Sequence, residues 1–227
     1  MGVSYTPCSI EAHFYFNKMG NTKEGQIVMP VSNGAKSAIE MSMPYRAKIK
    51  LVGTAKMLMH CWNNEAIAEK AAAKKGSAQK KTDDIESYLL RDEEGFIVMP
   101  CLNFCASIRT AGKSYPDPTS PRKSLHDRLK AIVVPEEEYG RINGGVKTWD
   151  FIDMRRVVIQ RAGITRSRPA FFEGWTLEFS VMILEPEFLP EALLAELVGN
   201  AGKFQGLGDF RPTFGRFRLD GFVTERI

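Results

Sequence analysis

Two stretches of alternating side chains constrain the fold of this chain more than any other feature. Residues 175–184 alternate between apolar and mostly polar side chains, and the apolar ones are Trp175, Leu177, Phe179, Val181 and Ile183. Residues 45–52 alternate in the same way, and Arg46, Lys48 and Lys50 lie opposite Ala47, Ile49 and Leu51. A period of two is typical of a β-strand with one buried face. We therefore expect both stretches to be core strands.

The remaining segments predict two packing helices and further strands. Pro100 heads a stretch with one apolar face that Gly112 ends, and Pro190 begins a second stretch that Gly199 ends. Shorter strands are expected at 96–99, 131–134, 154–160 and 214–222, and those at 131–134 and 154–160 are expected to be central. The order of strand, helix, strand, strand, helix, strand predicts an α+β fold, a ferredoxin-like (RRM-like) βαββαβ sandwich with insertions.

Three segments lie outside this core pattern. Residues 1–44 predict an N-terminal β-hairpin arm and linker in front of a single domain at 45–227. Residues 63–94 are rich in Ala, Lys and Glu, and they predict a helical insertion that is broken near Gly76 and capped again around Thr82 and Asp83. Three prolines between 116 and 121 exclude regular helix, so we expect an exposed basic loop at about 114–130.

The composition is that of an ordinary globular protein. The 227 residues are 44% hydrophobic and 26% charged. No apolar run reaches the roughly 18 residues that a membrane helix needs, and the N-terminal residues lack the apolar core of a signal peptide. We expect a cytoplasmic protein without membrane contact, in which the four cysteines are thiols. No cofactor or metal site is predicted, because Cys101 and Cys105 lack a second pair at a zinc-site spacing.

The basic residues are concentrated in three segments, although the net charge is only +4. These segments are 109–130, 141–168 and 203–218. If folding brings them together, one face becomes strongly positive, which is typical of a polyanion-binding site. Separate, solvated basic surfaces are the alternative, and the sequence leaves both open.

The glycine-rich segment 199–217 is the most informative motif. It holds five of the 19 glycines, with lysine, arginine and phenylalanine between them. Glycines let a backbone approach a ligand closely, while arginine and phenylalanine supply charge and stacking faces. The segment contains no Gly-Lys-Ser/Thr, and it leaves a helix to enter a strand, so it is neither a P-loop nor a dinucleotide fingerprint. A plain helix-to-strand connection is the alternative.

Two motifs together resemble a known family. The strand and proline-headed helix at 95–109, with the glycine-rich segment before the last strand, are similar to the RAMP superfamily of CRISPR-associated RNA-binding proteins, and most closely to the subunit that coats guide RNA. A Gly-Leu-Gly-Asp-aromatic-Arg-Pro ending like that at 206–212 also resembles phage-encoded relatives. The helix departs from the family's small-residue pattern at Cys101 and Phe104, and residues 1–44 have no counterpart.

The resemblance implies a non-catalytic protein that binds single-stranded RNA, with DNA as a possible substitute, in a bacterial or phage-infected cell. Copies of the chain would assemble along the strand as a filament, with other effector subunits as further partners. The end of the first helix and the glycine-rich loop would contact phosphates. Independently, arginines between 155 and 168 could line a groove in which bases stack on phenylalanines, although each phenylalanine could equally belong to the core. The predicted binding residues are Arg109, Lys113, Arg155, Arg156, Arg161, Arg166, Arg168, Lys203, Phe204, Phe210, Arg211, Phe214 and Arg216.

Two other functions stay open at this point. A metal-independent endoribonuclease could use His60 or His126 as a general base toward a 2′-hydroxyl, although neither histidine has a recognisable partner in the sequence. A phage-encoded interaction or decoy protein could keep the fold and bind protein in place of nucleic acid.

Overall fold

The structure is a computed structural model, and it describes residues 42–61, 68, 72, 84–159 and 162–227. All of them belong to one compact unit, Ile39–Ile227. The N-terminal arm expected at 1–44 falls almost wholly outside the described residues, and so does most of the insertion expected at 63–94. At the end of that insertion, the second expected helix is replaced by a single 3-10 turn, η1 (Glu86–Tyr88), after which Leu89 is extended.

A four-stranded antiparallel sheet forms the centre of the fold. Its strands are β1 (Tyr45–Gly53), β6 (Val133–Pro135), β10 (Thr176–Ile183) and β11 (Phe217–Arg226). Their spatial order is β11-β1-β10-β6, which is the ferredoxin-like order in which the first and third strands are central. The predicted α+β ferredoxin-like sandwich is confirmed.

The alternation in the sequence decides which face of this sheet is buried. Along β1, every second residue from Tyr45 to Gly53 is buried, and along β10 the same holds for Leu177, Phe179 and Val181. The two strands pair in register, with Ile49 opposite Phe179. The apolar residues of both strands therefore form one continuous buried face.

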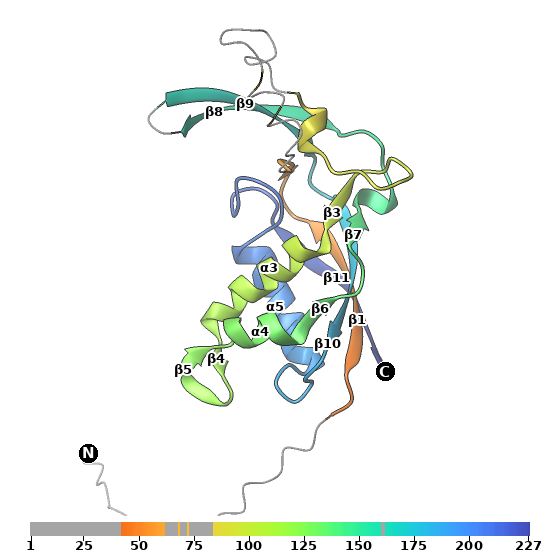
Figure 1. The fold of residues 1–227 in the computed structure, drawn as a ribbon, viewed down its shortest axis with the longest axis vertical. Coiled ribbons are helices and arrows are strands. Elements are labelled where there is room, and N and C mark those ends of the chain that lie inside the picture. Colours follow the sequence, from red (N-terminus) through yellow and green to blue (C-terminus); the bar gives the residue numbers. More distant parts are fainter. Residues whose placement is uncertain (1–41, 62–67, 69–71, 73–83, 160–161) are drawn as a thin grey trace, which may run out of the picture. The chain divides into compact units, whose positions relative to one another are not determined.

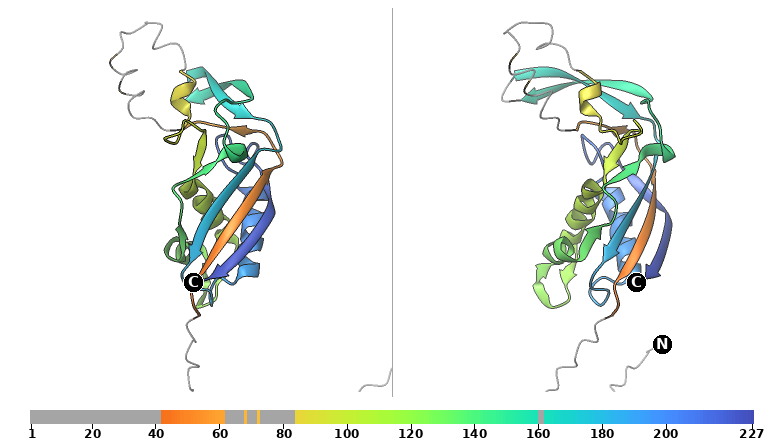
Figure 2. Two further views of the ribbon diagram at one scale, coloured as in Figure 1. Left: turned by 90° about the vertical axis from the view of Figure 1, so that its right-hand side faces the viewer. Right: turned by 45° about the vertical axis from the view of Figure 1, so that its right-hand side comes forward.

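The helices α3 (Cys101–Ala111), α4 (His126–Ile132) and α5 (Glu191–Phe204) lie on that buried face. Figure 2 shows all three on one side of the four-stranded sheet. The Phe104 ring of α3 stacks on the Phe179 ring of β10 with their centroids 4.8 Å apart. Because aromatic pairs in a core add specific contacts to simple burial, this stack fixes α3 against the centre of the sheet.

Helix α5 continues beyond the end expected at Gly199. The buried face of the helix, which includes Leu197 and Val198, continues through Ala201 and Gly202. A side chain at Gly202 would collide with the backbone of Phe217, so this glycine lets α5 lie directly against the start of β11. The helix ends only at Phe204, because its packing against β11 outweighs the tendency of Gly199 to end a helix.

The predicted central strand at 154–160 belongs to another sheet, which is the main correction to the expected fold. β8 (Phe151–Ile159) and β9 (Ala162–Phe171) form a long antiparallel hairpin, and β2 (Met57–Leu58) pairs with the far edge of β9. In Figure 1 this hairpin crosses the end of the molecule opposite the C-terminus. An apolar, β-branched run identifies a strand but carries no information about which sheet receives it.

Small elements complete the domain. β3 (Val98–Pro100) pairs with β7 (Tyr139–Arg141), and η3 (Ile142–Gly144) follows β7. The segment expected as a basic loop at 114–130 instead holds η2 (Gly112–Ser114), the short hairpin β4 (Pro116–Asp117) and β5 (Ser120–Ser124), and the first turns of α4. No helix in the described part of the chain is long and apolar enough to cross a membrane.

Candidate nucleic-acid interface

The glycine-rich loop between α5 and β11 is held in place by backbone hydrogen bonds to a distant part of the chain. The amide of Asp209 donates to the carbonyl oxygen of Leu58 at 2.8 Å, and the amide of Gly215 donates to that of Lys56, also at 2.8 Å. The loop also closes on itself, because Leu207 N–H donates to the Gly215 carbonyl oxygen. Residues 205–216 are therefore anchored to the segment around β2.

Two glycines in this loop are required by their surroundings. Gly215 has φ of +71°, and a side chain there would overlap the carbonyl oxygen of Leu207. Gly208 has φ of +79°, and its Cβ would overlap the carbonyl oxygen of Leu58. Only glycine adopts such backbone angles without strain and leaves room for the crossing chain. The glycines let the loop lie flat against its anchor and turn the side chains between them outward.

One face of the β8–β9 hairpin lies over this loop. Directly opposite residues of an antiparallel pair share a face, and the register places Asp153 opposite Arg168 and Arg155 opposite Arg166. In Figure 1 the loop that follows α5 lies beneath the hairpin. The hairpin thus brings Arg155 and Arg168 to the phenylalanines of residues 210–214.

Arginines of the hairpin stack on phenylalanines of the loop. The Arg155 guanidinium lies 4.4 Å from the centre of the Phe214 ring, and the Arg168 guanidinium lies 4.7 Å from that of Phe210. The two phenyl rings meet edge to face with centroids 6.5 Å apart. These cation–π contacts join segments about 50 residues apart in the sequence into one array of alternating charge and aromatic surface.

A second aromatic pair at the base of the hairpin extends this array. Phe151 and Phe172 stack with centroids 4.7 Å apart, and the Lys56 ammonium lies 5.2 Å and 5.7 Å from their centres. Phe172 is half exposed. These three residues are not predicted from the sequence, although phenylalanines at the outer ends of a basic hairpin are a signal that could have identified two of them. The loop–hairpin surface is defined here as Lys56, Phe151, Arg155, Phe172, Phe210, Arg211, Phe214 and Arg216.

Arg168 has a structural place in this surface. Its side chain is only 6% exposed, and its Nε donates to Asp209 Oδ2 at 2.6 Å. Its Nη1 is buried without a hydrogen-bond partner among the described residues. The expectation that Arg168 presents its charge along a groove is therefore wrong: it ties the glycine-rich loop to β9.

The other predicted arginines differ in exposure. Arg155 and Arg156 are exposed on β8, and Arg155 also pairs with Asp153 at 2.6 Å. Arg166 is half-buried and its Nη1 donates to the Tyr88 hydroxyl at 3.0 Å. Arg161 lies outside the described residues.

The helix ends contribute further basic residues. Arg109 lies in the last turn of α3, where its Nε is buried and has no hydrogen-bond partner in the described structure. Lys113 is exposed in η2, and Lys203 is exposed in the last turn of α5. In the loop, Arg211 is exposed, and Arg216 donates from Nε to the Pro212 carbonyl oxygen at 2.8 Å. The phenylalanines there are on the surface, with Phe204 65% and Phe210 38% exposed.

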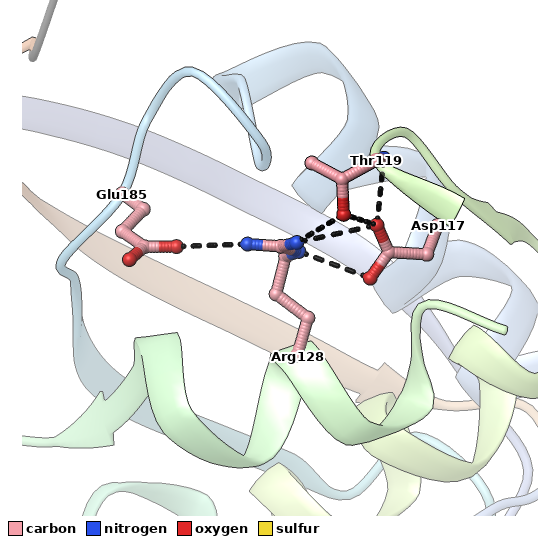
Figure 3. A network of polar contacts seen from close by, with 4 residues as sticks. All are labelled: Asp117, Thr119, Arg128 and Glu185. Carbon is pink, nitrogen blue, oxygen red and sulfur yellow. Dashed lines mark hydrogen bonds and ion pairs between the residues drawn. The ribbon is translucent and has the colours of Figure 1, made fainter. Parts of the chain in front are cut away.

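The basic segment at 114–130 does not supply all its charge to a common face. Arg128 is surrounded by Asp117, Thr119 and Glu185, as Figure 3 shows, with the Thr119 hydroxyl 2.7 Å from Nη2. Its guanidinium also covers the Phe188 ring at 4.0 Å. The Arg128 contact and the Thr119 hydrogen bonds hold the pKa of Asp117 well below its usual range, so this network stays charged. Part of the expected positive face is thus neutralised within the fold.

The two histidines lie in separate surroundings. His60 stacks on Tyr88 with centroids 4.4 Å apart, next to the segment where Met59 N–H donates to the Pro169 carbonyl oxygen of β9. His126 begins α4 and contacts the carboxylate of Asp127 at 3.0 Å.

Cys101 and Cys105 are buried free thiols. The hydrogen bond with the Cys105 sulfur, together with burial, raises the pKa of Cys101. The described residues contain no cluster of three or more His, Cys, Asp or Glu side chains that could hold a metal ion.

Comparison with known proteins finds a distant likeness of fold. No protein-family model matches the chain, and no curated protein matches it. Among solved structures, the chain is similar to a chain of the cryo-EM structure of the Type III-B Cmr-beta bound to cognate target RNA, with a TM-score of 0.47 and 7% sequence identity. The match covers 81% of this chain and 61% of that chain, so this chain spans about three fifths of the length of its structural neighbour.

Proposed function

We propose that the protein binds single-stranded nucleic acid, RNA in preference to DNA, and does not cleave it. The observation that carries this proposal is the exposed Arg155 guanidinium of the hairpin over the Phe214 ring of the loop, with the exposed Phe210 ring edge to face against Phe214. Proteins that bind single strands without strong sequence preference combine positive charge along the backbone with aromatic faces for the bases. The RAMP resemblance of the sequence points to the same class.

The arginines and the phenylalanines of the loop–hairpin surface each suit the binding of a single strand. The exposed Arg155 guanidinium stacks on Phe214 and pairs with Asp153 through Nε, so its other N–H groups can donate to phosphate oxygens. Arg211 is exposed and has no ion pair with an acid among the described residues. Half-exposed rings such as Phe172 offer faces to bases of any sequence. The loop–hairpin surface therefore has both components that a single strand requires.

Assembly along the strand is the second part of the proposal. Copies of the chain would bind side by side on one RNA, and residues 1–44 and the insertion at 63–94 would contact a neighbouring copy. Other effector subunits would contact the ends of this assembly. This part is supported by the resemblance alone, and it predicts stepwise larger complexes as the RNA is lengthened.

Binding of the purified full chain to matched single-stranded RNA and DNA over a salt series tests the proposal. We expect tighter binding to RNA, intact RNA on a denaturing gel, and an affinity that falls steeply with salt. Arg211→Ala should weaken binding and lower the slope of log K against log salt by about 0.7, the contribution of one contact to a phosphate of a single strand. Arg122→Ala, an exposed arginine on β5 away from the hairpin, is the matched control and should leave both quantities unchanged.

Other outcomes would overturn the proposal. RNA shortened by the wild-type chain but not by His60→Ala or His126→Ala variants would indicate an endoribonuclease. No binding at low salt would exclude both nucleic-acid functions and favour the interaction or decoy protein. Equal losses in Arg211→Ala and Arg122→Ala would show that the loop–hairpin surface is not the binding site.

A further inference from the structure

A pocket with a cavity volume of about 550 Å³ lies where three segments meet. The segments are the C-terminal half of α3, the end of α5 and the glycine-rich loop. Its lining includes the side chains of Thr110, Phe204, Gln205, Asp209, Phe210 and Arg211. Its volume is within the range of roughly 300–1,000 Å³ that is typical of small-molecule sites.

The aromatic faces of the loop are not equally free. One face of Phe214 is covered by Arg155 and one face of Phe210 is covered by Arg168. Phe204 is 65% exposed, and no ring or cation covers it among the described residues. A phenylalanine left largely in water at the edge of a pocket gains free energy when another flat, apolar face covers it.

The backbone of Phe210 indicates that its position is enforced. Its φ is +56°, a left-handed backbone conformation that residues other than glycine, asparagine and aspartate rarely adopt. Residues held in such conformations need a surrounding structure that fixes them, and they cluster at ligand sites. Here Asp209 fixes it, because Oδ1 accepts the Phe210 amide at 2.9 Å while Oδ2 accepts Arg168.

The pocket also carries hydrogen-bonding groups suited to the edge of a base. The Gln205 amide can donate and accept at once, and the Asp209 carboxylate oxygens each keep a free lone pair. The Thr110 hydroxyl donates to the Ala106 carbonyl oxygen at 2.8 Å, so its own oxygen remains available as an acceptor. Arg211 is exposed at the rim, where a phosphate next to a bound base would lie.

We infer that this pocket binds one nucleobase of the bound strand, unstacked from its neighbours. The base stacks on Phe204, its edge contacts Gln205 and Asp209, and Arg211 binds the adjoining phosphate. This inference rests on the proposed function and adds to it: phosphate contacts alone are indifferent to the base, whereas this pocket makes affinity depend on the base at one position of each bound segment.

The test compares the full chain with its Phe204→Ala variant on two single strands of equal length, one with bases and one in which every nucleotide is abasic. Loss of one base stack should weaken binding of the base-bearing strand by about 5- to 100-fold. Binding of the abasic strand should stay within about twofold, because phosphate contacts are untouched. Gln205→Ala should change the ranking among the four homopolymers more than their mean affinity.

Val223→Ala is the matched control, because Val223 is 66% exposed but lies on β11, on the sheet face opposite the helices. It should leave both strands unaffected, and thermal unfolding should show that both variants fold like the wild-type chain. Equal weakening of both strands by Phe204→Ala would overturn the pocket, since Phe204 would then only support the loop. Equal binding of the base-bearing strand by the wild-type chain and by Phe204→Ala would overturn the pocket and leave the proposed function standing, whereas no binding of either strand by the wild-type chain would overturn the proposed function itself.

Discussion

Neutralising Asp209 should loosen the glycine-rich loop more than removing the arginine with which it pairs. Asp209→Asn keeps the shape of the side chain and its contact with the Phe210 amide, but it removes the charge of the carboxylate with which the buried Arg168 guanidinium forms its ion pair. Arg168→Met removes the buried charge instead, and the carboxylate of Asp209, whose side chain is 34% exposed, can then be hydrated. The two variants therefore separate the cost of a buried charge from the loss of the contact.

The structure sets the expected magnitude. Breaking a buried ion pair from one side costs about 3–5 kcal/mol. Because Asp209 is partly in water, solvent screens the pair and the lower end, about 3 kcal/mol, is expected. This cost falls first on the loop, whose anchors are the hydrogen bonds from the amides of Asp209 and Gly215 to the segment around β2.

Native-state hydrogen exchange at those two amides is the assay. A loss of about 3 kcal/mol corresponds to a decrease in protection of about 100-fold in Asp209→Asn. Amides in β1 and β10 should keep their protection and serve as an internal reference. A decrease below about fivefold in Asp209→Asn, or a larger decrease in Arg168→Met, would refute the reasoning that the buried guanidinium depends on this carboxylate.

Three further predictions concern the stability of the fold. Gly215→Ala should lower the melting temperature and weaken RNA binding, because the new Cβ overlaps the Leu207 carbonyl oxygen; an unchanged melting temperature would contradict the loop geometry. Asp117→Asn should destabilise the protein most at pH 5–7, because Arg128 lowers the pKa of Asp117 from 3.8 and the stabilisation is present above that value. The difference in melting temperature from wild type should shrink as the pH falls below about 4, and a constant difference would argue against the ion pair. Phe104→Ala should reduce the free energy of unfolding in urea by about 3–5 kcal/mol, since the ring is fully buried under β10, and a loss below about 1 kcal/mol would contradict this packing.

The elements that the sequence predicts best are those whose pattern depends on burial alone. β1, β10 and α3 lie within one or two residues of the expected positions, because alternation and one-sided helical periodicity follow directly from which face is buried. The β8–β9 hairpin was assigned to the wrong sheet, because strand pairing depends on partners far away in the chain. The extension of α5 beyond Gly199 could not be predicted for the same reason. The backbone of Phe217, against which Gly202 packs, comes later in the sequence than the helix itself.

Prediction of the candidate site was limited in a similar way. Composition identified the glycine-rich segment and the arginines of the hairpin, but composition cannot distinguish an arginine that binds a ligand from one that holds a loop. Arg168 and Arg155 lie 13 residues apart in one basic run, yet one is buried against Asp209 and the other is exposed over Phe214. Both arginines lie on the same face of the hairpin, at neighbouring pairs of the register, so the difference arises from the loop residues that each one meets, which the basic run itself does not show.

The position of β1 at the centre of the sheet has a consequence for how the chain is made. This strand comes first among the four, but its two sheet neighbours are β10 and β11, which follow more than 120 residues later. While the chain grows on a ribosome, the apolar face of β1 and both of its unpaired edges have no native partner until the last strands emerge. Folding of the central sheet therefore waits until β10 and β11 have been synthesised, and during that interval the first core strand is exposed to non-native pairing.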